Sequence, residues 1–224
     1  ERVSYAGRHY TLPLPDGPGK SLKLTLPARA DLPIYLAAVG PKNLELAGEI
    51  ADGVLAIFYS PAYAAHIRDA LAIGRARAGK GAAGDPLDGF DIVATVPVVV
   101  TDDVEAGLSA ISSYAALYVG GMGSREQNFY NQLAVRMGFA DEAAKVQDLY
   151  LAGRHRAAAA AVPLEFIDAT SLVGPPQRIA PRLAALADAG VTTLAVSPFS
   201  MDRQERLRTL QVMADVRADA GLVP

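Results

Sequence analysis

The hydrophobic residues of this chain fall into two kinds of segment that alternate along it. Short, continuously apolar runs predict strands buried on both faces, as in a parallel sheet, at residues 32–39, 54–58, 92–100 and 192–196. Apolar residues at helical spacing predict helices at residues 41–51, 61–78, 174–189 and about 202–220. Either Asp102 or Asp103 is expected to cap a further helix, with Glu105 in its first turn.

Strands and helices joined by short connections predict right-handed parallel crossovers. Because four strands are too few to close a barrel, the pattern alone favours an open doubly wound α/β sheet. Two segments depart from this alternation. Residues 3–12 alternate around Gly7 and predict a hairpin, followed by a loop and a short strand at 22–26, whereas residues 118–165 predict an inserted helical subdomain after the glycines at 120–123.

Composition narrows the class of protein. The chain has 224 residues, of which 51% are hydrophobic and 20% charged, with a net charge of -3, as in a soluble globular protein. Its basic residues are dispersed, so no nucleic-acid partner is expected. No apolar run approaches the roughly 18 residues of a membrane span, so no membrane partner is expected. The absence of cysteine excludes disulfides and thiolate catalysis and is compatible with the cytoplasmic location that we expect.

Familiar catalytic and metal-binding patterns are missing from the sequence. The three histidines, His9, His66 and His155, are not spaced with carboxylates as metal ligands, so no metal site is predicted. Neither a G-x-S-x-G nucleophile elbow nor a P-loop is present. The chain opens at Glu1 without an initiator methionine, which suggests a fragment, a processed chain or an incomplete record.

Three separated motifs carry a family resemblance. Residues 35–53, YLAAVGPKNLELAGEIADG, resemble the fifth strand and following helix of the luciferase-like oxidoreductases that use coenzyme F420, a deazaflavin. Residues 117–123, LYVGGMG, with NFY at 128–130, are similar to a segment of one branch of that family. The closing run from LVGP at 172–175 to GVTTL at 190–194 resembles the family as well.

The resemblance replaces the open sheet by a (β/α)8 TIM barrel of the bacterial-luciferase type. It implies that residues 1–224 are the C-terminal part of one barrel domain, with strands five to eight and with residues 118–165 as a helical insertion. The first half of the barrel, which in relatives supplies a non-prolyl cis peptide and much of the substrate pocket, is then expected to precede this segment. The segment alone is expected to be inactive, and relatives are commonly dimers, so a homo-oligomer is expected.

The strongest candidate site is the turn formed by Ala37, Ala38, Val39 and Gly40. It lies at the C-terminal end of a predicted strand, just before a helix N-terminus, where small side chains and free N–H groups favour an anion. The resemblance implies that this turn holds the phosphate and linker of the coenzyme. The alternative is a tight βα turn in which small residues only permit packing, and the pattern alone favours that alternative.

Other cofactor-binding candidates each have a structural alternative. Either Tyr59 or Ser60, which follow a strand, contacts the coenzyme, or Ser60 simply caps a helix. Arg125 lies in the glycine-rich segment, either in a flexible loop where it meets a phosphate or carboxylate, or in a connector. Ser197 ends the last strand as a ligand contact or as an ordinary loop serine. Asp52, in contrast, precedes its strand and is assigned a turn or capping role.

The preferred function is hydride transfer between coenzyme F420 and an organic small-molecule substrate, with the chemistry supplied by the coenzyme. No catalytic acid or base is identified. One rival is an FMN-dependent monooxygenase of the same superfamily. Others are a non-catalytic half-barrel remnant and a phosphate-binding barrel isomerase, for which no base is found.

Overall fold

The computed structural model describes residues 4–17, 25–27 and 29–222. The chain divides into two compact units, Glu1–Leu32 and Pro33–Pro224, which are treated separately. In the first unit, β1 (Tyr5–Ala6) pairs antiparallel with β2 (Thr11–Leu12), and the amide of Gly7 donates to the carbonyl of Tyr10 at 2.8 Å. The predicted hairpin is thereby confirmed. Most of the short strand expected at 22–26 lies outside the described residues.

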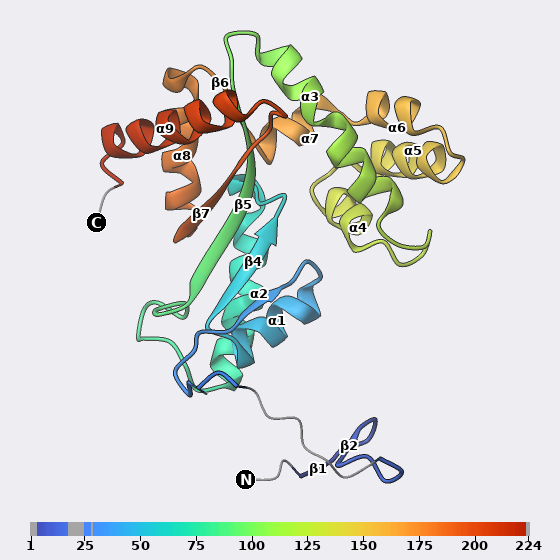
Figure 1. Cartoon of the computed structure of the whole chain (residues 1–224), viewed down its shortest axis with the longest axis vertical. Helices are drawn as coiled ribbons and strands as arrows, with labels where there is room; N and C mark the ends of the chain where they lie inside the picture. Colours follow the sequence, from blue (N-terminus) through green and yellow to red (C-terminus); the bar gives the residue numbers. More distant parts are fainter. Residues whose placement is uncertain (1–3, 18–24, 28, 223–224) are drawn as a thin grey trace. The chain divides into compact units, whose positions relative to one another are not determined.

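The second unit is built on a parallel sheet (Figure 1). Its strands are β3 (Tyr35–Ala37), β4 (Gly53–Ile57), β5 (Asp91–Val100), β6 (Leu172–Gly174) and β7 (Thr193–Pro198). β5 is the central strand, because its residues 91–95 pair with β4 along one edge and its residues 93–98 pair with β7 along the other. β6 pairs with residues 98–100 of β5, on the side of β5 that faces β4 and beyond the last residue with which β4 pairs.

One face of this sheet is covered by four helices and forms the first hydrophobic core. These helices are α1 (Pro41–Ile50), α2 (Ala64–Arg77, entered through the 3-10 turn η1 at Pro61–Tyr63), α8 (Pro176–Asp188) and α9 (Arg203–Asp219). Alternate strand residues such as Val54, Ile92 and Val96 point into this core and are almost fully buried. The period of two along each strand therefore decides which side chains the helices cover.

Helices α1 and α2 approach each other through two glycines. A β-carbon on Gly48 would lie 2.2 Å from the carbonyl oxygen of Leu71, and one on Gly74 would lie 1.8 Å from that of Glu45. Both glycines are therefore required by packing, since no side chain fits between the two backbones. Beside this crossing, the buried carboxylate of Glu45 accepts from Lys42 at 2.8 Å and from Arg77 at 2.7 Å, and these bonds lower its pKa.

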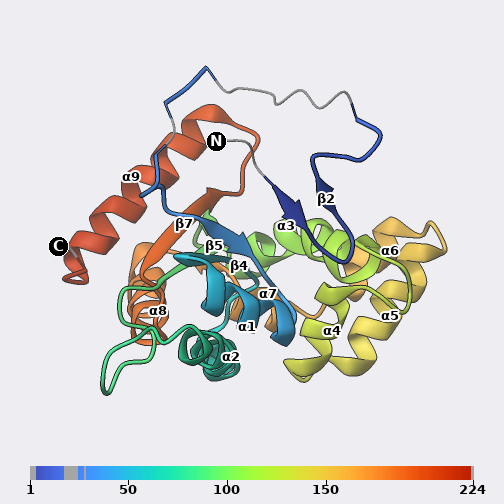
Figure 2. The ribbon, with the colours of Figure 1, turned by 90° about the horizontal axis from the view of Figure 1, so that it is seen from below.

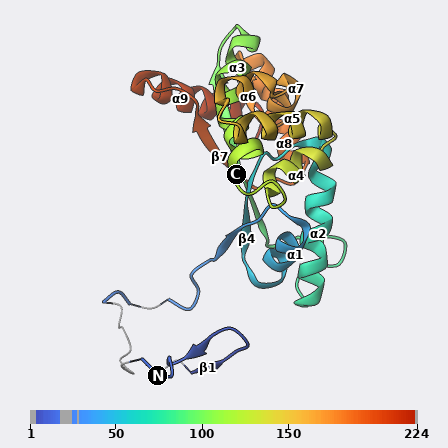
Figure 3. The same cartoon turned by 90° about the vertical axis from the view of Figure 1, so that its right-hand side faces the viewer.

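A second core is formed by the helices between β5 and β6. They are α3 (Val104–Ala116), the π-helix η2 (Leu117–Gly121), α4 (Phe129–Arg136), α5 (Ala140–Leu151), α6 (His155–Ala161) and α7 (Leu164–Ala169). Helices α4 to α6 lie on the opposite side of the sheet from α8 and α9 in both Figure 1 and Figure 2. In Figure 3 the same helices lie above α1 and α2.

Most predicted elements are confirmed, including the cap of α3, where the Asp103 carboxylate accepts from the amide of Ala106 at 3.0 Å. Three details were wrong. The run at 32–39 was expected to be buried on both faces, yet β3 spans only Tyr35–Ala37, and both Tyr35 and Ala37 are exposed. Leu172–Gly174 was not predicted as a strand, yet it forms β6, and Gly120 and Gly121 were assigned to a loop, whereas they lie in η2. None of the helices in the described part of the chain is long and apolar enough to span a bilayer.

Candidate functional site

The carboxyl ends of the strands gather several of the residues that the sequence singled out. Ala37 ends β3, Ser60 follows β4, and Ser197 lies near the end of β7. Since parallel strands place their carboxyl ends at one edge of a sheet, these three positions share the edge at which α/β enzymes bind ligands. Asp52 lies at the opposite edge, where its carboxylate accepts from the amide of Ile34 at 2.8 Å, which confirms a structural role.

The turn from Ala37 to Gly40 joins β3 to α1. Ala37 is exposed, Ala38 is buried, and Val39 and Gly40 are half-buried. Gly40 occupies the N-cap position of α1, where no side chain caps the helix and where the first turn contains no acidic residue. The amide of Leu44 donates to the carbonyl of Gly40 at 3.0 Å. The N–H groups of Lys42 and Asn43 precede this first intrahelical donor and are left without a helical acceptor.

Glycine is a favoured N-cap residue, but neither the backbone conformation nor the packing requires a glycine at residue 40. Its φ of -79° and ψ of 151° are open to any residue. A β-carbon placed there would lie 3.9 Å from Cδ1 of Phe129, which is an ordinary contact, and no closer atom is found among the described residues. This position therefore differs from Gly48 and Gly74, where a side chain would collide with a neighbouring backbone.

Phe58, directly after β4, has the left-handed φ of 53° that non-glycine residues rarely adopt. Its buried ring is the centre of an aromatic cluster, with ring centroids 5.7 Å from those of Tyr114 and Tyr118 and 5.3 Å from that of Phe166. Such backbone strain persists only where surrounding contacts fix it, and it is concentrated at functional sites. This cluster was not predicted from the sequence, although Tyr114 and Tyr118 stand four residues apart, a spacing that brings two side chains to one face of a helix.

Two tyrosines whose rings lie beside Phe58, Tyr114 and Tyr130, stay neutral over the ordinary pH range. Burial, followed by the nearness of Tyr118, raises the pKa of Tyr114 to about 12. Burial, again followed by Tyr118, also raises the pKa of Tyr130. These groups can donate hydrogen bonds or form an apolar wall, but they do not act as bases near neutral pH.

The helix α4 is fixed beside this cluster by the amide of Asn128. This side chain is 1% exposed, and its nitrogen donates to the carbonyls of Tyr118 at 2.9 Å and Val119 at 3.0 Å. Its oxygen accepts from the amides of Tyr130 and Asn131, both at 3.0 Å. The start of α4 and the π-helix η2 are thus held together by one buried side chain.

The other three predicted coenzyme contacts, Ser60, Arg125 and Ser197, each have partners within the protein. Ser60 is buried and does not cap η1 with its side chain, while its carbonyl accepts from the amide of Tyr63 at 3.0 Å. Arg125 is exposed and forms an ion pair with Asp148, so its charge is already neutralised within the helical region. Ser197 is half-buried and lies opposite Pro97 of β5.

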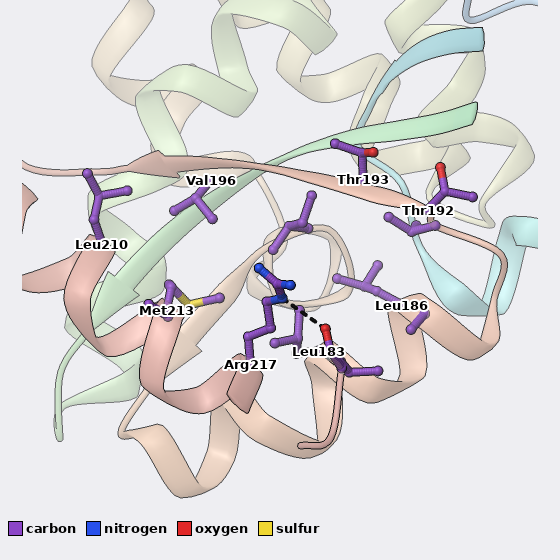
Figure 4. A pocket seen from close by; sticks show the side chains of 13 residues that line it. Leu183, Leu186, Thr192, Thr193, Val196, Leu210, Met213 and Arg217 are labelled. Atoms are coloured by element: carbon purple, nitrogen blue, oxygen red, sulfur yellow. Dashed lines mark hydrogen bonds between the residues drawn. The ribbon is translucent and has the colours of Figure 1, made fainter. Parts of the chain in front are cut away.

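Two cavities border the sheet. One of about 590 Å³ lies at the carboxyl end of β5, between the starts of α8 and α9. Its polar lining consists of Thr101, Asp102, Ser200, Glu205, Arg208 and Thr209. The other, of about 710 Å³, lies between β7, α8 and α9 and is mainly apolar, with Arg217 donating to the carbonyl of Leu222 at 2.8 Å (Figure 4). It includes the first residues of β7, away from the carboxyl ends, so we do not assign it to the chemistry.

The parallel sheet, its covering helices and the turn before α1 give the architecture of an α/β protein. The chain belongs to the luciferase-like monooxygenase family, whose model matches residues 1–193. It is 42% identical over 213 residues to a protein of Mycobacterium tuberculosis that is named as a coenzyme F420-dependent oxidoreductase, covering 93% of this chain and 60% of the relative.

Two further relatives are reductases. The 5,10-methylenetetrahydromethanopterin reductase of Archaeoglobus fulgidus is 29% identical over 185 residues, which cover 80% of this chain and 52% of that protein. The solved structure of the coenzyme F420-dependent tetrahydromethanopterin reductase from Methanopyrus kandleri superposes with a TM-score of 0.64 at 26% identity, covering 80% of this chain and 49% of that one. The chain thus spans about half to three-fifths of the length of these relatives.

Proposed function

We propose that this protein is a coenzyme F420-dependent oxidoreductase that transfers a hydride between the deazaflavin and a small organic substrate. Two relatives, from Mycobacterium tuberculosis and Methanopyrus kandleri, carry coenzyme F420 in their names, and a third is named a 5,10-methylenetetrahydromethanopterin reductase, which supports this choice. The observation within this chain that carries the proposal is Gly40. This N-cap glycine is not required by its backbone or its neighbours, and it leaves open space above the turn that a ligand can occupy.

The turn has the properties of a phosphate site. The N–H groups of Lys42 and Asn43 and the positive end of the α1 dipole favour an anion, and the first turn has no carboxylate that would compete. Ala37, Ala38 and Val39 add small or moderate side chains that let the backbone approach the ligand. In this proposal these four residues bind the phosphate and linker of the coenzyme, with Ser60 and Ser197 as further contacts from neighbouring strand ends.

When bound, the coenzyme supplies the hydride chemistry at its ring carbon C5. The chain's own residues position the coenzyme and exclude water. The aromatic cluster around Phe58 forms an apolar wall beside the strand ends, and Tyr114 and Tyr130 stay protonated because their pKa values are raised. We assign Arg125 a lesser place in this proposal, since Asp148 already pairs with its guanidinium.

We further propose that β3, β4, β5 and β7 correspond to strands five to eight of a (β/α)8 barrel, with residues 118–165 as a helical insertion. Their shared parallel direction and their order along the chain support this assignment. β6 is then an accessory strand at the carboxyl end of β5. From the same resemblance we propose that the active protein is a homo-oligomer.

A second candidate function is an FMN-dependent monooxygenase, which the description of the family model favours. The two coenzymes differ at the reacting position, where flavin has a nitrogen and deazaflavin a carbon. Titration of the complete gene product with coenzyme F420 and with FMN, followed by the fluorescence of each coenzyme, separates the two functions. Tighter binding of FMN, with oxygen consumed by its reduced form, would establish the monooxygenase instead.

Gly40→Ala tests the site within that titration. The Ala methyl group fits the protein, so we expect the free energy of unfolding to change by at most about 1 kcal/mol. The same methyl group covers the turn, so we expect the Kd for coenzyme F420 to rise at least about tenfold, or about 1.4 kcal/mol. The control is Asp103→Ala, which removes the cap of another helix at the same sheet edge and should leave the Kd unchanged. Equal Kd values for Gly40→Ala and the parent would reject the turn as the phosphate site.

A further inference from the structure

The start of α4 is more firmly anchored than its exposure suggests. Besides the four hydrogen bonds of Asn128, the side-chain nitrogen of Asn131 donates to the carbonyls of Val119 at 3.1 Å and Ala143 at 2.8 Å. A π-helix such as η2 displaces carbonyl groups from the regular helical ladder, and these two amides satisfy them. The first turn of α4 is therefore held to both η2 and α5.

Phe129 is the residue that this anchoring presents to solvent. Its neighbour Asn128 is 1% exposed, whereas Phe129 is 51% exposed. Asn128 caps α4 and fixes the backbone of Phe129, so the exposed ring is attached to the first residue of an anchored helix. Its Cδ1 atom lies 3.9 Å from the point where Gly40 would carry a β-carbon. An apolar ring thus borders the open space above the proposed phosphate turn.

We propose that Phe129 is a coenzyme-contacting residue, whose ring packs against the carbon skeleton next to the phosphate bound at the Ala37–Gly40 turn. This inference rests on the proposed function. The ligand class is a phosphoester with an adjoining planar or aliphatic group, because the turn offers N–H groups to the anion and Phe129 offers an apolar face beside them. The ring shields the phosphate contacts from water, which strengthens them.

The 224 residues of this chain contain no tryptophan, so a tryptophan introduced among them adds one new emitter. Phe129→Trp places that indole at the proposed contact and retains an aromatic ring there, and the emission of the parent protein in the same titration is subtracted. Ile50→Trp is the matched control, since Ile50 is 59% exposed at the far end of α1. At 1.5 Å per residue, the helix separates the two ends of α1 by about 15 Å.

We expect coenzyme F420 to change the emission of Phe129→Trp more strongly than that of Ile50→Trp in the complete gene product. In the same titration, we expect Phe129→Ala to weaken the Kd about five- to tenfold, and Phe129→Leu to weaken it less, as loss of half the burial of a Phe side chain predicts. Thermal melts that match the parent within a few degrees show that the variants fold.

The outcomes separate the two proposals. Binding of the coenzyme by the parent, with a Kd unchanged by Phe129→Ala and equal emission changes at the two tryptophans, overturns the role of Phe129 and leaves the proposed function standing. Failure of the parent itself to change the coenzyme's own fluorescence overturns the proposed function and this inference with it.

Discussion

At the scale of single residues, the role of a residue in the candidate site is decided by its burial and its contacts and not by its type. Asn128 is an ordinary helix cap by sequence, yet it is almost fully buried and satisfies four backbone groups at once. Gly40 is unremarkable by conformation, and this is why it points to a ligand. Neither property can be predicted from residue type, because both depend on segments that are distant in sequence.

Asn128→Ala should destabilise the protein by about 2–4 kcal/mol. It removes the cap of α4 and the donor to the carbonyl of Tyr118, while the carbonyl of Val119 retains only the side-chain bond from Asn131. Asn128→Asp keeps the acceptor for the α4 amides but cannot donate, so it should also be destabilising. Urea unfolding measures both variants, with the exposed Asn43→Ala as the control. If Asn128→Ala lowers the free energy of unfolding by less than about 0.5 kcal/mol, the Asn128 side chain does not anchor α4.

The buried tyrosines predict a pH dependence of stability. Burial raises the pKa values of Tyr59 and Tyr114 to about 12, above the value near 10 of an unfolded chain. Between these values the folded state binds more protons than the unfolded state, so stability is retained below pH 10 and falls as the pH rises towards 12. In the variant with Tyr59→Phe and Tyr114→Phe this decline should be shallower. Unfolding curves across that range, with phenolate absorbance recorded alongside, provide the test, and identical slopes would argue against it.

At the scale of elements, the alternating apolar runs were sufficient to predict four strands and the helices that follow them. β6 was missed because it has three residues and ends at Gly174, whose φ of 132° lies outside the strand pattern. The π-helix was missed because the glycines at 120 and 121 indicate a loop by composition. They are there because the ring of Tyr150 packs on them, where a β-carbon would lie within 2.5 Å.

The close crossing of α1 and α2 is testable at this scale. Gly74→Ala forces a methyl group against the carbonyl of Glu45, so we expect the free energy of unfolding to fall by at least about 3 kcal/mol. Ile73→Ala, at the exposed neighbouring position, should cost less than about 1 kcal/mol. Chemical denaturation compares the two variants. A tolerated alanine at position 74 would mean that the helices separate more easily than their packing indicates.

At the scale of the whole molecule, β5 organises the second unit by pairing with β4, β6 and β7. Its parallel neighbours bring their carboxyl ends to one edge, and the helices from α3 to α7 border that edge with an aromatic cluster. The sequence predicted which edge carries the candidate site, because strand direction follows from the connections. It could not predict that Phe58 and Phe129 border it, since they come from different segments.

The most direct test of the central claim is an amide ¹⁵N–¹H correlation spectrum of the complete gene product during titration with coenzyme F420. If the phosphate binds at the turn before α1, the N–H signals of Gly40, Lys42 and Asn43 should shift in proportion to coenzyme bound, while those of Ile50 at the other end of the helix stay in place. Binding reported by the coenzyme's fluorescence with these three signals unmoved would contradict the account.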